Sequence, residues 1–360
     1  IVQDGIHPGL EAYRMILLPE LKRVLQQKWL PAKVDCPDIS KEVEDFLSSI
    51  DGHLRLLLCQ YKDSRLISSV QFSENGLKMD DMEWHAKVTA SNVAVEKNAM
   101  DVDITFQMKS GVARELGVGV AFDIKNWDIQ NYVMLPASIY NGNRCKIVSR
   151  GYNEGLERKY LYQQNIPLMS VPIPQLSPIN KGVSRLEVNA SNLATPAMCF
   201  FNKKQKKGLI ILSEQKTQFA DNGFMVEESA DRQEASFIIS APGVRHKKPE
   251  FIGFSDSPDR GADLNPGDEI NIRMRIYTVE ADDIPAFLEE FMKVRKSLTG
   301  QNQPRNLVPF SQVASWMTER IDERWFSNDQ FEFYCPENAN WISFGWIGGL
   351  MNTYPMLALG

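Results

Sequence analysis

The stretch AMCFFNKKQKKGLIILS (residues 197–213) decides the fold class, because two short apolar runs flank a basic segment. Each run has the length and the apolar and aromatic content of a buried β-strand. The four lysines between them, Lys203, Lys204, Lys206 and Lys207, are typical of a solvated hairpin tip. The stretch therefore predicts two antiparallel strands joined by a tight turn.

The same pattern of short apolar runs separated by turn residues extends in both directions, from His53 to about Thr278. Short β-rich runs follow one another, broken by Gly, Pro, Asn and Asp, without long helical repeats between them. A dozen such runs predict a large antiparallel β-sandwich rather than a parallel α/β sheet, so the chain is expected to be mainly β. The runs are HLRLLLC, LISSVQF, EWHAKVTA, VDITFQMK, VGVAFDI, NYVMLP, RLEVNA, AMCFFN, GLIILS, FMVEES, ASFIISA and INIRMRIYTV.

Helical periodicity is confined to the two ends of the chain. Near the N-terminus, one helix is expected between Leu10 and Gln27, and another follows a Ser40 cap. Near the C-terminus, one helix is expected after Asp282, and a second reaches about Trp325. The apolar positions that carry the last three patterns are Val43, Phe46, Leu47 and Ile50; Ile284, Phe287, Leu288, Phe291, Val294 and Leu298; and Val313, Trp316, Met317 and Ile321.

Composition excludes several classes of function. With 360 residues, 43% hydrophobic content and a net charge of −6, the chain can bury a large core but has no general basic surface for nucleic acid. No apolar stretch approaches the roughly 20 residues that span a bilayer. The five cysteines lie far apart without a CxxC pair, and the four histidines lack HExxH spacing. We therefore predict no metal site and no cofactor.

Three segments together resemble a known group of proteins. They are VAFDIKNWDIQNYVMLPASIYNGNR (residues 120–144), DIPAFLEEFMKVRKSL (residues 283–298) and WISFGWIGGLMNTYPMLALG (residues 341–360). They are similar to segments of bacterial six-hairpin glycosidase-like proteins, in which a galactose mutarotase-like supersandwich precedes an (α/α) toroid. The resemblance implies four parts: a partly helical segment (1–51), the β-supersandwich (52–281), a linker helix (282–304) and the start of a truncated toroid (305–360).

The segment YNGNR is the sharpest candidate for binding a sugar. The ring of Tyr140 can stack on a pyranose, the amides of Asn141 and Asn143 can bind vicinal hydroxyls, and Arg144 offers a fork of donors. The alternative is a β-turn in which the Asn side chains satisfy backbone groups and Arg144 pairs with an acid, for which Asp123 is one choice. Trp127 is either part of the same rim or a packing residue.

Two further candidates follow from the resemblance and lie near the mouth of the toroid. Trp346 could form part of a sugar-binding floor, although an indole beside Gly345 and Gly348 suits helix packing equally well. Glu337 precedes it in a loop and is the candidate for a polar contact with substrate. The catalytic carboxylates of such proteins come mostly from the toroid, so no catalytic residue is assigned in this chain.

The resemblance implies that the larger protein is a secreted or periplasmic glycoside hydrolase acting on a polysaccharide or oligosaccharide. This chain would then shape the substrate cleft. The alternative is a non-catalytic carbohydrate-binding or scaffold module. Because the chain ends within the apolar segment 341–360, which would expose an apolar patch, self-association through that segment is also expected.

Overall fold

The computed structural model describes residues 41–73, 76–94, 96, 98–144, 173–178, 182–250, 253–301 and 308–335, and residues 355, 356 and 358. The chain divides into two compact units, Ile1–Gly300 and Gln301–Gly360. The helix expected between Leu10 and Gln27 lies outside the described residues.

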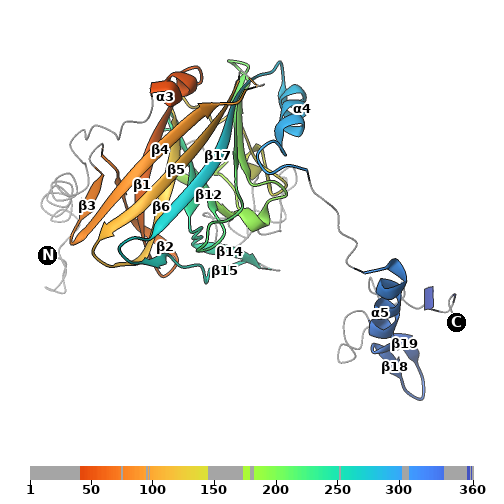
Figure 1. Cartoon of the computed structure of the whole chain (residues 1–360). Coiled ribbons are helices and arrows are strands. Elements are labelled where there is room, and N and C mark those ends of the chain that lie inside the picture. Colours follow the sequence, from red (N-terminus) through yellow and green to blue (C-terminus); the bar gives the residue numbers. More distant parts are fainter. Residues whose placement is uncertain are drawn as a thin grey trace, which may run out of the picture. The chain divides into compact units, whose positions relative to one another are not determined.

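The larger unit is a sandwich of two antiparallel sheets, as predicted, and each of the dozen predicted runs contains a strand (Figure 1). The first sheet has the order β2 (Arg65–Gln71), β1 (Gly52–Lys62), β6 (Ala113–Ile124), β13 (Ala235–Ala241), β12 (Gly223–Glu228), β9 (Ser184–Asn189), and β16 (Ala262–Leu264) also pairs with β6. The second sheet has the order β3 (Leu77–Met79), β4 (Met82–Asn92), β5 (Ala99–Ser110), β17 (Glu269–Glu280), β11 (Lys207–Ser213), β10 (Ala197–Asn202), β7 (Tyr132–Leu135), β8 (Ile139–Tyr140). Strands β14 (Lys247–Glu250) and β15 (Gly253–Asp256) form a separate hairpin.

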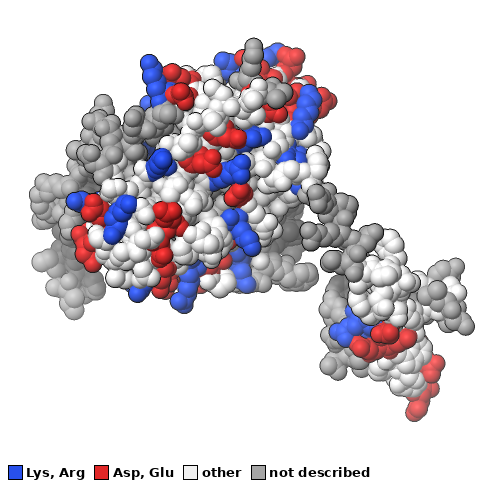
Figure 2. Space-filling view, viewed as in Figure 1, with Lys and Arg blue, Asp and Glu red and all other residues white. Residues whose placement is uncertain are grey.

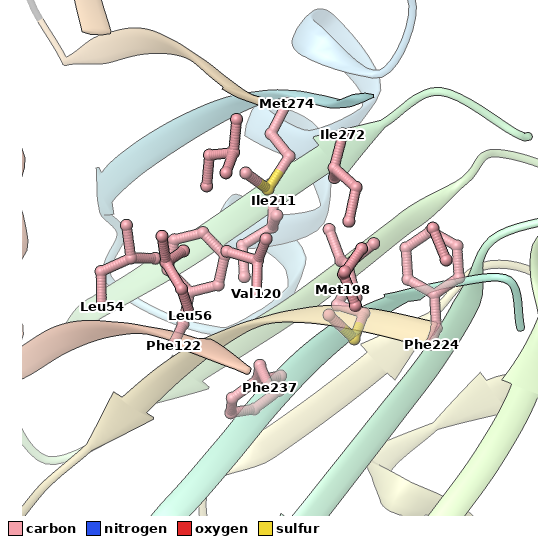
Figure 3. Close-up of a cluster of buried hydrophobic side chains, with 14 of the residues drawn as sticks. Leu54, Leu56, Val120, Phe122, Met198, Ile211, Phe224, Phe237, Ile272 and Met274 are labelled. Carbon is pink, nitrogen blue, oxygen red and sulfur yellow. The ribbon is translucent and has the colours of Figure 1, made fainter. Parts of the chain in front are cut away.

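The main core lies between the two sheets and follows the two-residue period of the strands. On β6, Val118, Val120 and Phe122 face the second sheet, whereas Gly119 and Ala121 face the opposite side. Figure 3 shows side chains of both sheets pointing toward one another in this layer. Each fully buried side chain of this kind stabilises the fold by roughly 1.5–3 kcal/mol relative to an exposed one. This layer therefore fixes which face of each strand remains outside.

Helices cover two parts of the sandwich. On the outer face of the second sheet, α4 (Ile284–Val294) buries Phe287 and Phe291, and the ring of Phe287 stacks on Phe201 at 5.3 Å between centroids. Its N-terminus is capped by the Asp283 side chain, which accepts from the backbone N–H of Ala286 at 2.9 Å. The helix α3 (Lys41–Ser48) buries Val43 and Leu47 of the predicted apolar stripe.

Charged side chains of both signs are interspersed over the face of the larger unit that Figure 2 shows. Many of them pair across neighbouring strands. Arg275 Nε on β17 donates to Asp101 Oδ1 on β5 at 2.6 Å, and Arg273 Nε lies 3.7 Å from Asp103 Oδ1. The outward positions of these strands are thus a solvated polar surface without a block of one charge.

The smaller unit contains α5 (Phe310–Asp322) and the hairpin of β18 (Trp325–Ser327) and β19 (Glu332–Tyr334). The helix expected to reach Trp325 ends three residues earlier, because Trp325 pairs with Tyr334 in the hairpin. Most of the apolar segment 341–360 lies outside the described residues. None of the helices in the described part of the chain is long and apolar enough to cross a membrane.

Candidate functional site

Two adjacent glutamates on β12 point to opposite faces of the first sheet. Phe224 and Val226 face the core, and Met225 and Glu227 alternate with them on the outer face. Glu228 follows at the end of the strand and is fully buried. Each glutamate belongs to a separate group of charged residues.

The Glu228 cluster consists of Glu228, Arg144, Arg232 and Trp127. Arg144 donates through Nη1 to Glu228 Oε2 at 3.0 Å and through Nη2 to Oε1. The indole Nε1 of Trp127 donates to Oε1 at 2.8 Å, and Arg232 Nε lies 3.5 Å from Oε2. The side chains of Glu228, Arg144 and Arg232 are 0%, 7% and 2% exposed. A carboxylate so enclosed needs such donors, since an unpaired buried charge is strongly destabilising.

The structure thus brings two predicted site residues, Trp127 and Arg144, into contact with one carboxylate. Trp127 is 3% exposed, and its ring packs edge-on against Phe200 and Phe237 at 5.5 and 5.7 Å between centroids. The acid that pairs with Arg144 is Glu228 and not Asp123, which binds Arg55 on β1. In the structure Trp127 is a packing residue and Arg144 pairs with an acid. For both residues this was the alternative to sugar binding in the sequence analysis.

The YNGNR turn (residues 140–144) is held by Asn143. Its Oδ1 accepts from the backbone N–H of Tyr140 at 3.1 Å, and its Nδ2 donates to the carbonyls of Ser138 and Pro174 at 3.1 and 3.0 Å. Gly142 has φ of +64°, and a Cβ there would lie 3.0 Å from the side chain of Leu176. Tyr140, 49% exposed, and Asn141, also exposed, remain at the surface. Glu337 and Trp346 lie outside the described residues.

The outer face of the first sheet has small side chains along its middle strands. Ala121, Gly119 and Ser240 lie there on β6 and β13, and Gly223 pairs with Ser240 in register. After β13 the chain folds back across this face, and Gly243 lies against Gly223. A Cβ on Gly223 would stand only 2.7 Å from the Cα of Gly243, so this crossing requires glycine. The returning segment 242–247 forms one wall of a hollow above the sheet.

The outer-face cluster consists of Arg185, Glu187 and Glu227 from β9 and β12, with Arg65 from β2 and His246 from the returning segment. Arg185 Nε donates to Glu227 Oε2 at 2.6 Å, and its Nη1 lies 3.9 Å from Glu187 Oε1. The backbone N–H of His246 donates to Glu187 Oε2 at 2.9 Å. All of these residues except Glu227 line a hollow of about 330 Å³, with Lys247 and two apolar side chains.

Glu187 and His246 have pKa values shifted in opposite directions. Burial raises the pKa of Glu187, although the His246 amide and Arg185 oppose the shift. Burial also lowers the pKa of His246, and the positive charges of Arg65 and Lys247 lower it further. Titratable groups whose pKa values are shifted in opposite directions within one hollow are typical of acid and base sites.

A second hollow of about 830 Å³ lies over the β1–β2 turn and shares Arg65 with the first. The hydroxyl of Ser64 fixes this turn by donating to the carbonyls of Ser257 and Asp259 at 2.6 and 2.7 Å. Asp259 pairs with Arg245 at 2.8 Å and belongs to the acidic loop, which is the segment SDSPDRGADLNPGDE (residues 255–269). Among the described residues, no group of three or more His, Cys, Asp or Glu side chains is placed to hold a metal ion.

The outer-face cluster was missed in the sequence. Arg185 and Glu187 alternate within RLEVNA, so the two-residue period places both on one polar face. Their meeting with Arg65 and His246 depends on the order of the strands and on the returning segment after β13. Neither of these follows from the local pattern.

No known protein family and no curated protein matches this sequence. Parts of three solved structures are similar to it. A candidate aldose 1-epimerase of Escherichia coli K12 is 13% identical over 57% of this chain and 67% of its own, with a TM-score of 0.29. A candidate aldose 1-epimerase of Klebsiella pneumoniae is 9% identical over 65% of this chain and 56% of its own, with a TM-score of 0.35. The Slr1438 protein of Synechocystis sp. PCC 6803 is 8% identical over 63% of this chain and 78% of its own, with a TM-score of 0.31.

This chain thus spans little more than half of the Klebsiella protein. A TM-score below 0.5 does not establish a common fold.

Proposed function

We propose that this chain binds a carbohydrate in the hollow of the outer-face cluster. The observation that carries the proposal is the set of planar polar groups around that hollow, the guanidinium groups of Arg65 and Arg185 and the carboxyl of Glu187. Such groups make paired hydrogen bonds to neighbouring hydroxyls, which is how polar pocket residues orient a small ligand. The resemblance to the supersandwich of carbohydrate-active proteins supports the same class of ligand.

Titration calorimetry of the folded chain against a panel of mono- and oligosaccharides tests this proposal. We expect saturable binding of at least one sugar, weakened about tenfold or more by Arg185→Ala, since a lost charged hydrogen bond costs about 1.5–3 kcal/mol. Arg273→Ala, which removes a half-exposed arginine of the second sheet, is the matched control and should leave affinity unchanged. A folded chain that binds no sugar on the panel contradicts the proposal.

At a finer level, we propose that the chain shapes the substrate cleft of an exported glycoside hydrolase, whose catalytic carboxylates lie in the toroid. The resemblance of segments 120–144, 283–298 and 341–360 supports this part. The test compares the larger protein with this chain alone on a glycan panel. Hydrolysis by the larger protein only is the expected result, and a larger protein inert toward every glycan contradicts it.

A second candidate function is proton transfer on the bound sugar by Glu187 and His246, favoured by their opposite pKa shifts. Moving a proton between a sugar hydroxyl and the ring oxygen opens and closes an aldose ring, and this needs one acid and one base. Polarimetry of freshly dissolved α-D-glucose and α-D-galactose measures the reaction. We expect faster equilibration with the chain and loss of that acceleration in Glu187→Gln. Equal rates with and without the chain exclude this activity for the two sugars.

A further inference from the structure

The hollow of the outer-face cluster has an excess of positive charge in its lining. Arg65, Arg185 and Lys247 line it, together with His246, and among the described residues of its lining Glu187 alone carries a carboxyl group. Burial raises the pKa of Glu187, so its environment disfavours the charged form of the carboxyl. A neutral sugar can gain from this lining only through hydrogen bonds, whereas a negatively charged group also gains from the positive charge.

Two of these cations already have acidic partners. Arg185 is bound to Glu227, and Lys247 Nζ pairs with Asp256 Oδ1. Arg65 differs, because its exposed guanidinium makes no ion pair or hydrogen bond with any residue that the structure describes. Asp256, which is bound to Lys247, also feels the charge of Arg65, but the donors of the Arg65 guanidinium are not used by the described residues.

The backbone of Arg65 is well anchored. It pairs with Lys62 across the β1–β2 turn, and Ser64 beside it bonds to two carbonyls of the acidic loop. A guanidinium on a fixed strand end can donate to both oxygens of a carboxylate with little further ordering of the backbone. Burial is the main cause of the lowered pKa of His246, and the positive charge of Arg65 lowers it further.

We propose that the hollow receives the carboxylate of an acidic sugar, a uronic acid class of ligand, and that Arg65 binds it. The proposal rests on the proposed function, since it names which carbohydrate the outer-face cluster takes. The adjoining larger hollow has balanced charges, with Lys62, Arg65 and Arg260 opposite Asp63, Glu115 and Asp256. It suits the hydroxyl-bearing remainder of an oligosaccharide that extends past Arg65.

Matched pairs of sugars test this proposal by calorimetry: D-glucuronate against D-glucose, and D-galacturonate against D-galactose. We expect each uronate to bind at least tenfold more tightly than its neutral partner, and added salt to reduce this preference because the site is open to solvent. Arg65→Ala should weaken uronate binding at least tenfold more than it weakens binding of the neutral partner, so that the preference for the uronate is lost. Arg65→Lys should retain part of the preference, because it keeps the charge and loses the fork.

The controls separate the possible failures. Arg273→Ala removes an arginine on the other sheet and should change nothing, and thermal unfolding confirms that each variant is folded. Equal binding of neutral and acidic sugars overturns this inference while the proposed function stands. Preference for a sulfated sugar over the uronate also overturns it. If no sugar of any kind binds, the proposed function falls with it.

Discussion

Glu227 and Glu228 are neighbours on one strand, yet they have opposite environments. Glu228 is enclosed among Arg144, Arg232 and Trp127, whereas the side chain of Glu227 is 32% exposed and pairs with Arg185 at the edge of a hollow. The first arrangement joins parts of the chain that are far apart in sequence and leaves no room for a ligand. The second is open to one. The comparison teaches that a buried ion pair ties distant segments together, whereas a partly exposed one leaves charged groups at the hollow where we propose that a ligand binds.

The largest expected effect is that of Glu228→Ala. It leaves the buried guanidinium groups of Arg144 and Arg232 without their carboxylate, and breaking a buried pair in this way costs about 3–5 kcal/mol of the free energy of unfolding. Urea unfolding followed by circular dichroism measures this as a lower midpoint at constant slope. Glu227→Ala is the matched control, and a loss of about 0–1 kcal/mol is expected there. Equal losses in the two variants would contradict the distinction between them.

Trp127→Phe removes one donor from the same carboxylate and should have a smaller effect. We expect a loss of roughly 1–3 kcal/mol, since a buried charged acceptor loses one of its hydrogen bonds while most of the ring packing remains. A double-mutant cycle with Glu228→Ala sharpens the test. The effect of Trp127→Phe should shrink in the Glu228→Ala background, because the acceptor is already gone. Simple additivity would mean that the indole acts through packing alone.

Glu187→Gln tests the open side of the comparison through its dependence on pH. Burial raises the pKa of Glu187, so the folded protein binds this proton more tightly than the unfolded chain does. The resulting stability is fully present below the ordinary carboxyl pKa and is lost as pH rises through the raised value. Glutamine does not ionise and escapes this loss. The variant's melting temperature should therefore exceed that of the wild type more at about pH 8 than at about pH 4; a constant difference contradicts the shift.

The smallest effect is expected for Tyr140→Ala. The side chain is half exposed, so the free energy of unfolding should change by no more than about 0.5 kcal/mol. Arg144→Ala, four residues later, should cost about 3–5 kcal/mol because it breaks the buried pair with Glu228. Chemical unfolding measures the free energy of unfolding of both variants. A difference between them shows that Arg144 stabilises the fold whereas Tyr140, at the other end of the YNGNR turn, does not. A large loss of stability in Tyr140→Ala would show that the turn acts as a unit.

The sequence predicted the sandwich well, because each strand carries its own two-residue period and its own turn residues. It also placed Trp127, Asn143 and Arg144 near one another, since they lie within one short stretch. It did not show that Arg144 binds Glu228, which lies 84 residues further along the chain. Nor did it bring Arg65, Arg185 and His246 together. Those contacts depend on sheet order, which the alternation of single strands does not encode.

The position of β17 in the second sheet also constrains how this protein can be made. This strand lies between β5 and β11, although it is the last strand of the larger unit in sequence (Figure 1). Until Glu280 has left the ribosome, the β3–β4–β5 group and the group from β11 to β8 have no shared neighbour and present two bare edges. Synthesis therefore completes this sheet from its centre. A nascent chain that stalls before β17 would expose both of these edges, and unpaired strand edges favour aggregation.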